Sequence, residues 1–457
     1  MAEPSRMNIT KVGSDVTGFK SERPSPGELD VYLSWACNQL QCPFAVAVTK
    51  VAQSQYVSVS AAKKNIVKSR AKLKQSSDSL AALLKDDRMG PSGYLEDEGT
   101  IKIFAIHDHL DRLVELKFED NAKLPRMLFQ IIGLIVQFHK CLQTITIRQG
   151  LDMYALYEIN KFLPSSNVTE LCLENTFLKE GNYSVLFENH NLIKRVSIAR
   201  CQITDTMIQD IAAKLAYPMP ASKTLIILDL STNRITDEGA KYLANALRSN
   251  RCLSYLNLSD NNLTDIGGEL LLDTLMTFPL TDDELKSDQS KSKRKSVKAA
   301  PPIKQVAKKV KGIEREGSLK LVPESKGAEA AELDSHLYDK ARDIAEGRMG
   351  KFMDPFNRDN LVVIDGIIYC LGNNALCRLN LSYNNLSYIS LKKLANVIVT
   401  QRLNRRKPVG LISVNLNGNN LPLYCTEMTQ IDVLLNSGAS DKNNRKRAAS
   451  KTISSFK

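Results

Sequence analysis

The segment that decides the fold is LIILDLSTNRITDEGAKYLANAL, residues 225–247. It opens with alternating apolar residues, and such alternation points Leu228 and Leu230 to one side of a strand and their neighbours to the other. Asn233 follows, and its short amide can satisfy backbone groups that a turn leaves unpaired. The pair Thr236-Asp237 contains good helix N-caps, and apolar residues at helical spacing come next. The segment therefore predicts a strand, a turn and a helix.

The same leucine and asparagine spacing recurs along the chain and is clearest again from Leu253 to Asn261 and from Leu376 to Asn384. The first five steps between units are 29, 26, 25, 32 and 28 residues. A near-constant step indicates stacked units, because the inward leucines of one unit need the next unit to bury them. Eight units can be registered, and they start at Leu113, Leu142, Val168, Ile193, Leu225, Leu253, Leu376 and Leu411.

These units resemble the leucine-rich repeat family in its ribonuclease-inhibitor-like subtype, over residues 113–278 and 360–421. The resemblance implies an α/β solenoid with a curved parallel sheet inside and helices outside. Two units depart from the pattern. Cys201 takes the asparagine position of the fourth unit, and Leu386-Ser387-Tyr388 lacks the aspartate expected at the helix start.

The pattern divides the chain into six parts. We expect a disordered N-terminus (1–30), a helical lead-in that caps the first repeat (31–112), six repeats (113–278), a lysine-rich insertion (279–359), two further repeats (360–437) and a basic tail (438–457). Residues 361–371 are expected to form a repeat helix, and Asn373 and Leu376 mirror Asn250 and Leu253. The insertion should therefore leave and re-enter the array in phase, at little cost to the fold.

The positive charge is concentrated in three segments. Residues 286–311, 439–457 and 61–85 carry net charges of +9, +5 and +6, against +12 for the whole chain. The remaining residues are therefore net acidic. Charge separated in this way is informative about the kind of partner that each part of the chain can attract. Residues 61–85 are expected to form a basic helix that either leans on the array or docks on an acidic surface.

The lysine-rich insertion allows three interpretations: a solubilising linker, a clamp on a polyanion such as the acidic tails of tubulin or a nucleic acid, or a nuclear import signal. No aromatic residue lies between Lys286 and Lys311, which disfavours base stacking and sequence-specific nucleic-acid binding. The residues assigned to polyanion binding are Lys293, Arg294, Lys295, Lys308 and Lys309.

No catalytic motif stands out, and we expect neither a cofactor nor a metal ion. His107-x-His109 has no third ligand at matching spacing. No run of about 18 apolar residues suggests a membrane span. The cysteines at repeat positions are expected to be buried, reduced thiols of a cytoplasmic or nuclear protein.

Binding should then fall to the outward strand positions, which form a strip along the concave side. The glutamates should make its N-terminal half acidic, and arginine and tyrosine supply larger contact groups. The strip contains Glu115, Lys117, Glu119, Arg148, Glu170, Glu174, Arg195, Asp229, Tyr255, Asn257 and Arg378.

We therefore expect a non-enzymatic scaffold that binds protein partners. The layout resembles ciliary and flagellar members of the repeat family, which implies a place on the axoneme with basic segments facing tubulin. One alternative is a regulator of a Ran-type GTPase, although those proteins have an acidic C-terminal tail, whereas this chain has the basic run Asn443-Asn444-Arg445-Lys446-Arg447 there. Another is a nuclear adaptor. The oligomeric state is left open.

Overall fold

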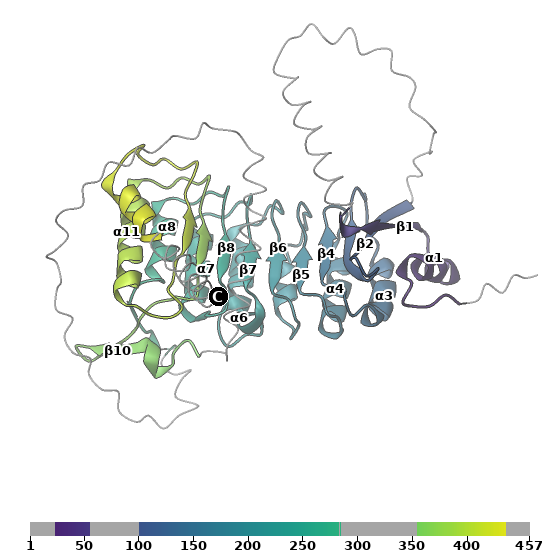
Figure 1. The fold of residues 1–457 in the computed structure, drawn as a ribbon, viewed down its shortest axis with the longest axis horizontal. Coiled ribbons are helices and arrows are strands. Elements are labelled where there is room, and N and C mark those ends of the chain that lie inside the picture. The colour runs from purple at the N-terminus through teal and green to yellow at the C-terminus, as the bar shows by residue number, and fades with distance from the viewer. Residues whose placement is uncertain (1–22, 55–99, 283, 285–353, 436–457) are drawn as a thin grey trace, which may run out of the picture.

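The computed structural model describes residues 23–54, 100–282, 284 and 354–435. A ten-stranded sheet runs the length of the array, with its strands side by side in Figure 1. The strands are parallel except for the antiparallel pair β2–β3. In sheet order they are β1 (Ala45–Ala52), β2 (Thr100–His107), β3 (Leu113–Phe118), β4 (Thr144–Ile147), β5 (Glu170–Cys172), β6 (Arg195–Ser197), β7 (Ile227–Asp229), β8 (Tyr255–Asn257), β12 (Arg378–Asn380) and β13 (Ser413–Asn415).

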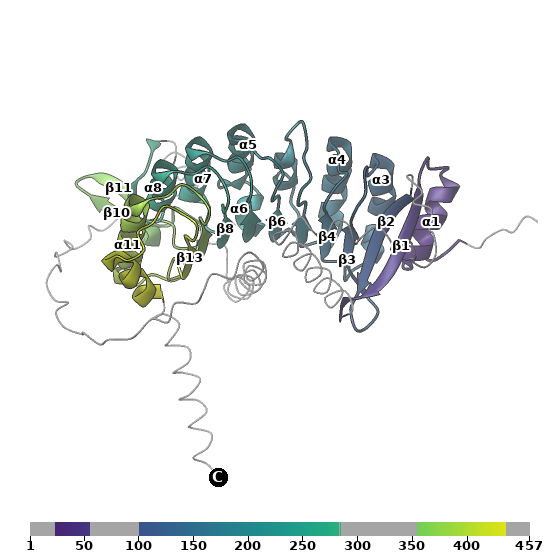
Figure 2. The same ribbon diagram turned by 90° about the horizontal axis from the view of Figure 1, so that it is seen from above.

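Helices cover one face of this sheet, and the array bends with the strands on the inner side (Figure 2). The predicted α/β leucine-rich repeat solenoid is confirmed. The α-helices of the units are α3 (Arg126–Ile135), α4 (Met153–Phe162), α5 (Asp205–Leu215), α6 (Ala221–Thr224), α7 (Asp237–Ser249), α8 (Asp265–Asp273) and α11 (Tyr388–Leu403). Short 3-10 turns occupy Val136–Phe138, Leu163–Ser165, Tyr183–Phe187 and Arg358–Asn360.

Each of the eight predicted units contributes one strand, and the strands pair in register. Leu228 faces Leu256, and Leu256 faces Leu379 across the insertion. All three side chains are at most 2% exposed. The chain therefore re-enters the array in phase, as predicted, and a single core continues past residues 280–375.

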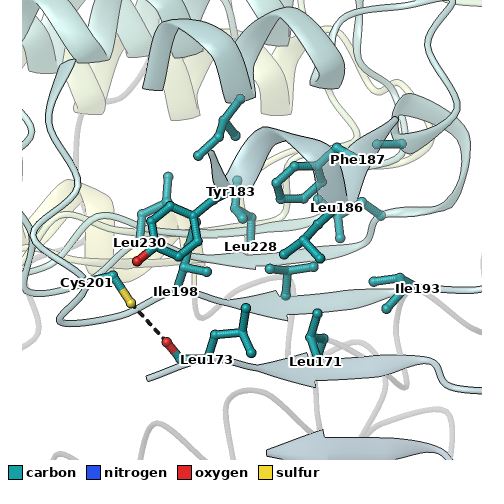
Figure 3. Close-up of a cluster of buried hydrophobic side chains, with 14 of the residues drawn as sticks. Leu171, Leu173, Tyr183, Leu186, Phe187, Ile193, Ile198, Cys201, Leu228 and Leu230 are labelled. Atoms are coloured by element: carbon teal, nitrogen blue, oxygen red, sulfur yellow. Dashed lines mark hydrogen bonds between the residues drawn. The ribbon is translucent and has the colours of Figure 1, made fainter. Parts of the chain in front are cut away.

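The core between sheet and helices is apolar, as Figure 3 shows for the third to fifth units. Cys201 occupies the asparagine position there, and its thiol donates to the carbonyl oxygen of Leu173 in the preceding unit at 2.9 Å. Asparagines at the same position also reach back by one unit. The amide of Asn261, for example, donates to Leu230 O, and its oxygen accepts Ile235 N–H. These buried amides join neighbouring units as well as closing their own turns.

The lead-in is only partly helical. Helix α1 (Leu29–Gln39) packs against α3, as expected of a cap, and begins inside the segment assigned to the disordered N-terminus. Strands β1 and β2 then extend the sheet beyond the first repeat. The alternation of Ala45–Ala52 was the sequence signal for β1, which the predicted helical lead-in did not take into account.

The predicted repeat helix over residues 361–371 is wrong. These residues form a hairpin, β10 (Leu361–Ile364) and β11 (Ile367–Cys370), which pairs with β9 (Phe278–Pro279) in a separate three-stranded sheet. Asp365 and Gly366 both have positive φ, 49° and 80°, as a two-residue hairpin turn requires. The β-branched run on either side of an Asp-Gly pair therefore favours strands over a helix.

Arginines of the repeats anchor the segments where the chain leaves and re-enters the array. Arg406 donates to Leu371 O, Gly372 O and Asn360 Oδ1 at 2.7–2.9 Å. Arg248 donates to Glu284 and lies over the ring of Phe278, 4.1 Å from its centroid. The two ends of the insertion are therefore fixed to the body of the array.

The expected basic helix (61–85), the residues assigned to polyanion binding and the basic tail (438–457) lie outside the described residues. Among the helices that the structure describes, none is long and apolar enough to cross a membrane.

Candidate functional site

The concave strip consists of two rows of outward side chains, one residue to either side of the core row. Strand register fixes both rows. The first row runs Glu115, Thr144, Glu170, Arg195, Ile227, Tyr255, Arg378 and Ser413, and the second runs Lys117, Thr146, Cys172, Ser197, Asp229, Asn257, Asn380 and Asn415. Of the predicted strip residues, Glu119, Arg148 and Glu174 lie just beyond the strand ends, and the rest belong to these rows.

Ion pairs link neighbouring strands in the N-terminal half of the strip. Glu119 lies between Lys117 Nζ and Arg148 Nη1, with its Oε1 at 3.3 and 3.2 Å from them. Arg195 Nη1 lies 3.3 Å from Glu170 Oε2. Positive and negative side chains therefore alternate in the N-terminal half of the strip, whereas the sequence predicted that this half would be acidic.

Glu115 accepts a hydrogen bond from the hydroxyl of Thr146, at 2.8 Å. Arg148 remains the most accessible cation of this half, with its side chain 51% exposed. Lys117, Glu119, Glu170 and Arg195 all have further interaction partners in the folded chain. Charged side chains here are thus held in place by neighbours on adjacent strands.

A cavity of about 330 Å³ opens on this face where β5, β6 and β7 begin. Glu170, Arg195 and Ile227 of the lining belong to the first row, which alternation along the strands identifies. The other lining residues lie just before the strands begin, where strand alternation gives no signal for them. The lining residues are Gln143, Thr169, Glu170, Lys194, Arg195, Ile226 and Ile227.

An apolar cluster occupies the middle of the strip, on the opposite face of the sheet from the main core. Ile226, Ile227 and Tyr255 form it, with Cys252 packed against them. Ile227 and Tyr255 are direct neighbours across β7 and β8. The outward face of a solvated sheet is usually polar. Here the three side chains are only 2–3% exposed, so they are buried against their neighbours. Charged residues of the first row, Arg195 and Arg378, flank it on either side.

Arg378 lies beside Tyr255 and is 6% exposed. Burial lowers the pKa of its guanidinium, while Tyr255 acts in the opposite direction. Its Nε and Nη1 have no hydrogen-bond partner within the part of the chain that the structure describes. Buried guanidinium donors are normally paired, and a carboxylate or carbonyl oxygen is the acceptor that suits them.

Asp229 and Asn257 have a structural role that the sequence analysis did not assign. Each accepts the backbone N–H two residues later, Ser231 N at 2.9 Å and Ser259 N at 3.1 Å, and so ends its own strand. They are 6% and 0% exposed. Their oxygens are therefore partly committed to the turn, which weakens their assignment as contact residues.

Burial raises the pKa of the Cys172 thiol to about 12, which keeps it protonated and a poor nucleophile. His107 Nδ1 lies 3.0 Å from Ala105 O. Across the described ranges, no three His, Cys, Asp or Glu side chains are grouped to hold a metal ion.

A family model described as leucine-rich repeat matches residues 221–244 and 249–272, the two units that contain β7, α7, β8 and α8. A search of curated proteins finds no match to the chain. The family match therefore covers the units that form the apolar cluster, while the remaining units are recognised by their register in the sheet.

Proposed function

We propose that this protein is a non-enzymatic scaffold whose concave strip binds a protein partner. The observation that carries the proposal is the apolar cluster of Ile226, Ile227 and Tyr255 in the middle of the outward face. Protein interfaces commonly place an apolar, aromatic centre inside a polar rim, with arginine and tyrosine contributing strongly. Arg195 and Arg378 are the charged neighbours of this centre on the adjacent strands.

We further propose the microtubule cytoskeleton, in particular the axoneme of cilia and flagella, as the place of action. The support is the segregated charge of the sequence, because three basic segments are attached to a net acidic remainder. The acidic tails of tubulin are a suitable polyanion for lysine-rich segments, and such contacts weaken as salt rises. On this view the strip selects a protein partner and the basic segments add electrostatic attachment.

Co-sedimentation with microtubules tests the tubulin proposal. The full chain should sediment with native microtubules, and it should do so weakly once the acidic tails have been removed by protease or salt has been raised. A variant lacking residues 286–311 should lose much of this association. Equal sedimentation with tailless microtubules would contradict the electrostatic contact.

Proximity labelling in ciliated cells tests the concave strip, with Tyr255→Ala compared with the control Asn415→Ala at the C-terminal end of the second row. Tyr255→Ala should remove a set of labelled partners that Asn415→Ala retains. Labelling confined to nuclear proteins would favour the adaptor alternative. Faster GTP hydrolysis by a purified Ran-type GTPase in the presence of this protein would favour the regulator alternative.

A further inference from the structure

We propose that Cys37, Cys42 and Met127 form a binding site for one soft, monovalent metal ion, with Cu(I) as the probe. The site lies where the N-terminal cap meets the first repeat helix, outside the concave strip, and is independent of the proposed scaffold function. No spacing in the sequence predicts this site, because Met127 stands 85 residues from Cys42.

The backbone at the end of α1 brings the two cysteines together. Gln41 has a positive φ of 49°. Its N–H donates to Asn38 O at 3.2 Å, and Cys42 N–H donates to Cys37 O at 3.0 Å. This pair of bonds is a Schellman motif, in which the side chains three residues before the cap and two residues after it regularly touch. Those two positions are Cys37 and Cys42.

The two thiols are close enough to affect each other's protonation. Burial raises the pKa of Cys37 to about 12, and the charge of Cys42 and a hydrogen bond with its side chain act in the same direction. Cys37 is 3% exposed, whereas Cys42 is half-buried. One thiol is therefore enclosed in the core, and the other lies where solvent can reach it.

The third sulfur comes from α3. Cys42 Sγ lies 3.8 Å from Met127 Sδ, and Met127 is also half-buried. Metal–thiolate bonds of about 2.3 Å in a trigonal plane would set the sulfur atoms roughly 4 Å apart. The observed separation thus suits a metal ion between them with little movement of either helix.

The donor set determines the class of ion. Two thiolates and a thioether are soft ligands, which select Cu(I) over ions that prefer oxygen. Closed zinc sites use four nitrogen or sulfur ligands, so three sulfurs suit zinc less well. Binding replaces the thiol protons by the metal, so the affinity should rise with pH.

Anaerobic titration of the full chain with Cu(I), in competition with a chromogenic chelator and under a non-thiol reductant, tests the site. The matched variants are Cys42→Ser, Met127→Leu and the control Cys141→Ser, whose cysteine is half-buried elsewhere in the array. Far-UV circular dichroism and thermal unfolding show which variants keep the fold. X-ray absorption counts the sulfur neighbours of the bound copper.

The site predicts one tightly bound Cu(I) per chain with three sulfur neighbours. Cys42→Ser should lower the affinity for Cu(I) at least 100-fold. Met127→Leu should reduce the number of sulfur neighbours to two, with a smaller loss of affinity. Cys141→Ser should change neither the affinity nor the sulfur count. Equal affinity in the wild type and Cys42→Ser would overturn the proposal, as would an equal loss in Cys141→Ser. A Cys37–Cys42 disulfide that forms in place of copper binding would overturn it too.

Discussion

The carboxylate of Asp237 caps a helix in the following unit. Its Oδ1 accepts the backbone N–H of Thr264 at 2.8 Å and that of Gly267 at 3.0 Å, and its Oδ2 accepts the Thr264 hydroxyl. Asp205 makes the same bonds to Thr236 and Gly239. These aspartates join successive helices, just as the buried asparagines join successive turns.

Replacing Asp237 by alanine should therefore destabilise the array. The substitution removes three hydrogen bonds, two of them to first-turn N–H groups that the helix itself does not satisfy. We expect a loss of about 1–3 kcal/mol in the free energy of unfolding, measured in urea. Asp210→Ala, at an exposed position on α5, is the control, and an equal effect of the two changes would refute the inter-unit cap.

Gly267→Ala should also destabilise, although alanine is favoured over glycine in helices by about 1 kcal/mol. A Cβ at position 267 would lie 2.4 Å from Asp237 Oδ1, so the carboxylate would be displaced. In the Asp237→Ala background the same change should cost less, because the close contacts that remain are those with Ala240 Cβ and the Cα of residue 237, both at 3.1 Å. Unfolding of the four proteins in this double-mutant cycle measures the coupling, and additive effects would argue against a carboxylate held at that glycine.

The last aspartate of the series should make stability depend on acid pH. Burial would raise the pKa of Asp265, but hydrogen bonds from Ser387 and Ser390 lower it below the ordinary 3.8. A lowered folded-state pKa gives stability that is present above about pH 4 and is lost as pH falls through the folded value. The difference in stability between wild type and Asp265→Asn should therefore shrink on acidification, whereas Asp210→Asn should show a smaller change.

Asparagine and cysteine at the turn position should differ in their contribution to stability. Asn261→Ala leaves Ile235 N–H and several carbonyl groups without their partner, and should cost about 2–4 kcal/mol. Cys201→Ala removes only a thiol donor and should cost about 1 kcal/mol. Urea unfolding checks the order, with the exposed helical Asn245→Ala as the control. A larger loss at Cys201 would contradict the assigned roles.

Deleting residues 286–311 should leave the thermal midpoint of unfolding unchanged. The anchoring contacts of Arg248 and Arg406 involve residues outside that segment, and the register of β8 with β12 is set by the array itself. Differential scanning calorimetry measures the midpoint. A marked fall, or loss of the cooperative transition, would show that the segment contributes to the fold.

The sequence predicted the repeats well because a spacing of leucines specifies both the strand and the face that it buries. The pair Thr236-Asp237 was also a correct signal for the start of α7, where Thr236 is the N-cap. It could not show that Asp237 reaches into the next unit, because that contact depends on how neighbouring helices pack. Ser390 illustrates this point, since it stands where glycine is found in α7 and α8 and donates its hydroxyl to Asp265.

The candidate site was predicted less completely than the fold. Alternation identified the outward rows, yet Ile227 and Tyr255 become one apolar cluster only through the register of two strands. The pairing of Glu119 with Arg148 likewise depends on side chains of adjacent units. Charges that look additive in the sequence therefore offset each other on the folded face.

The central claim is that one solenoid continues across the insertion, and hydrogen exchange tests it most directly. Leu258 N–H donates to Asn380 O, and Arg378 N–H donates to Ser254 O. If β8 and β12 are paired, both amides should exchange as slowly as amides in the middle of the array, such as Leu230 N–H, which donates to Asn257 O. Rapid exchange at Leu258 and Arg378, with protection retained at Leu230, would show instead that the two sets of repeats fold as separate units.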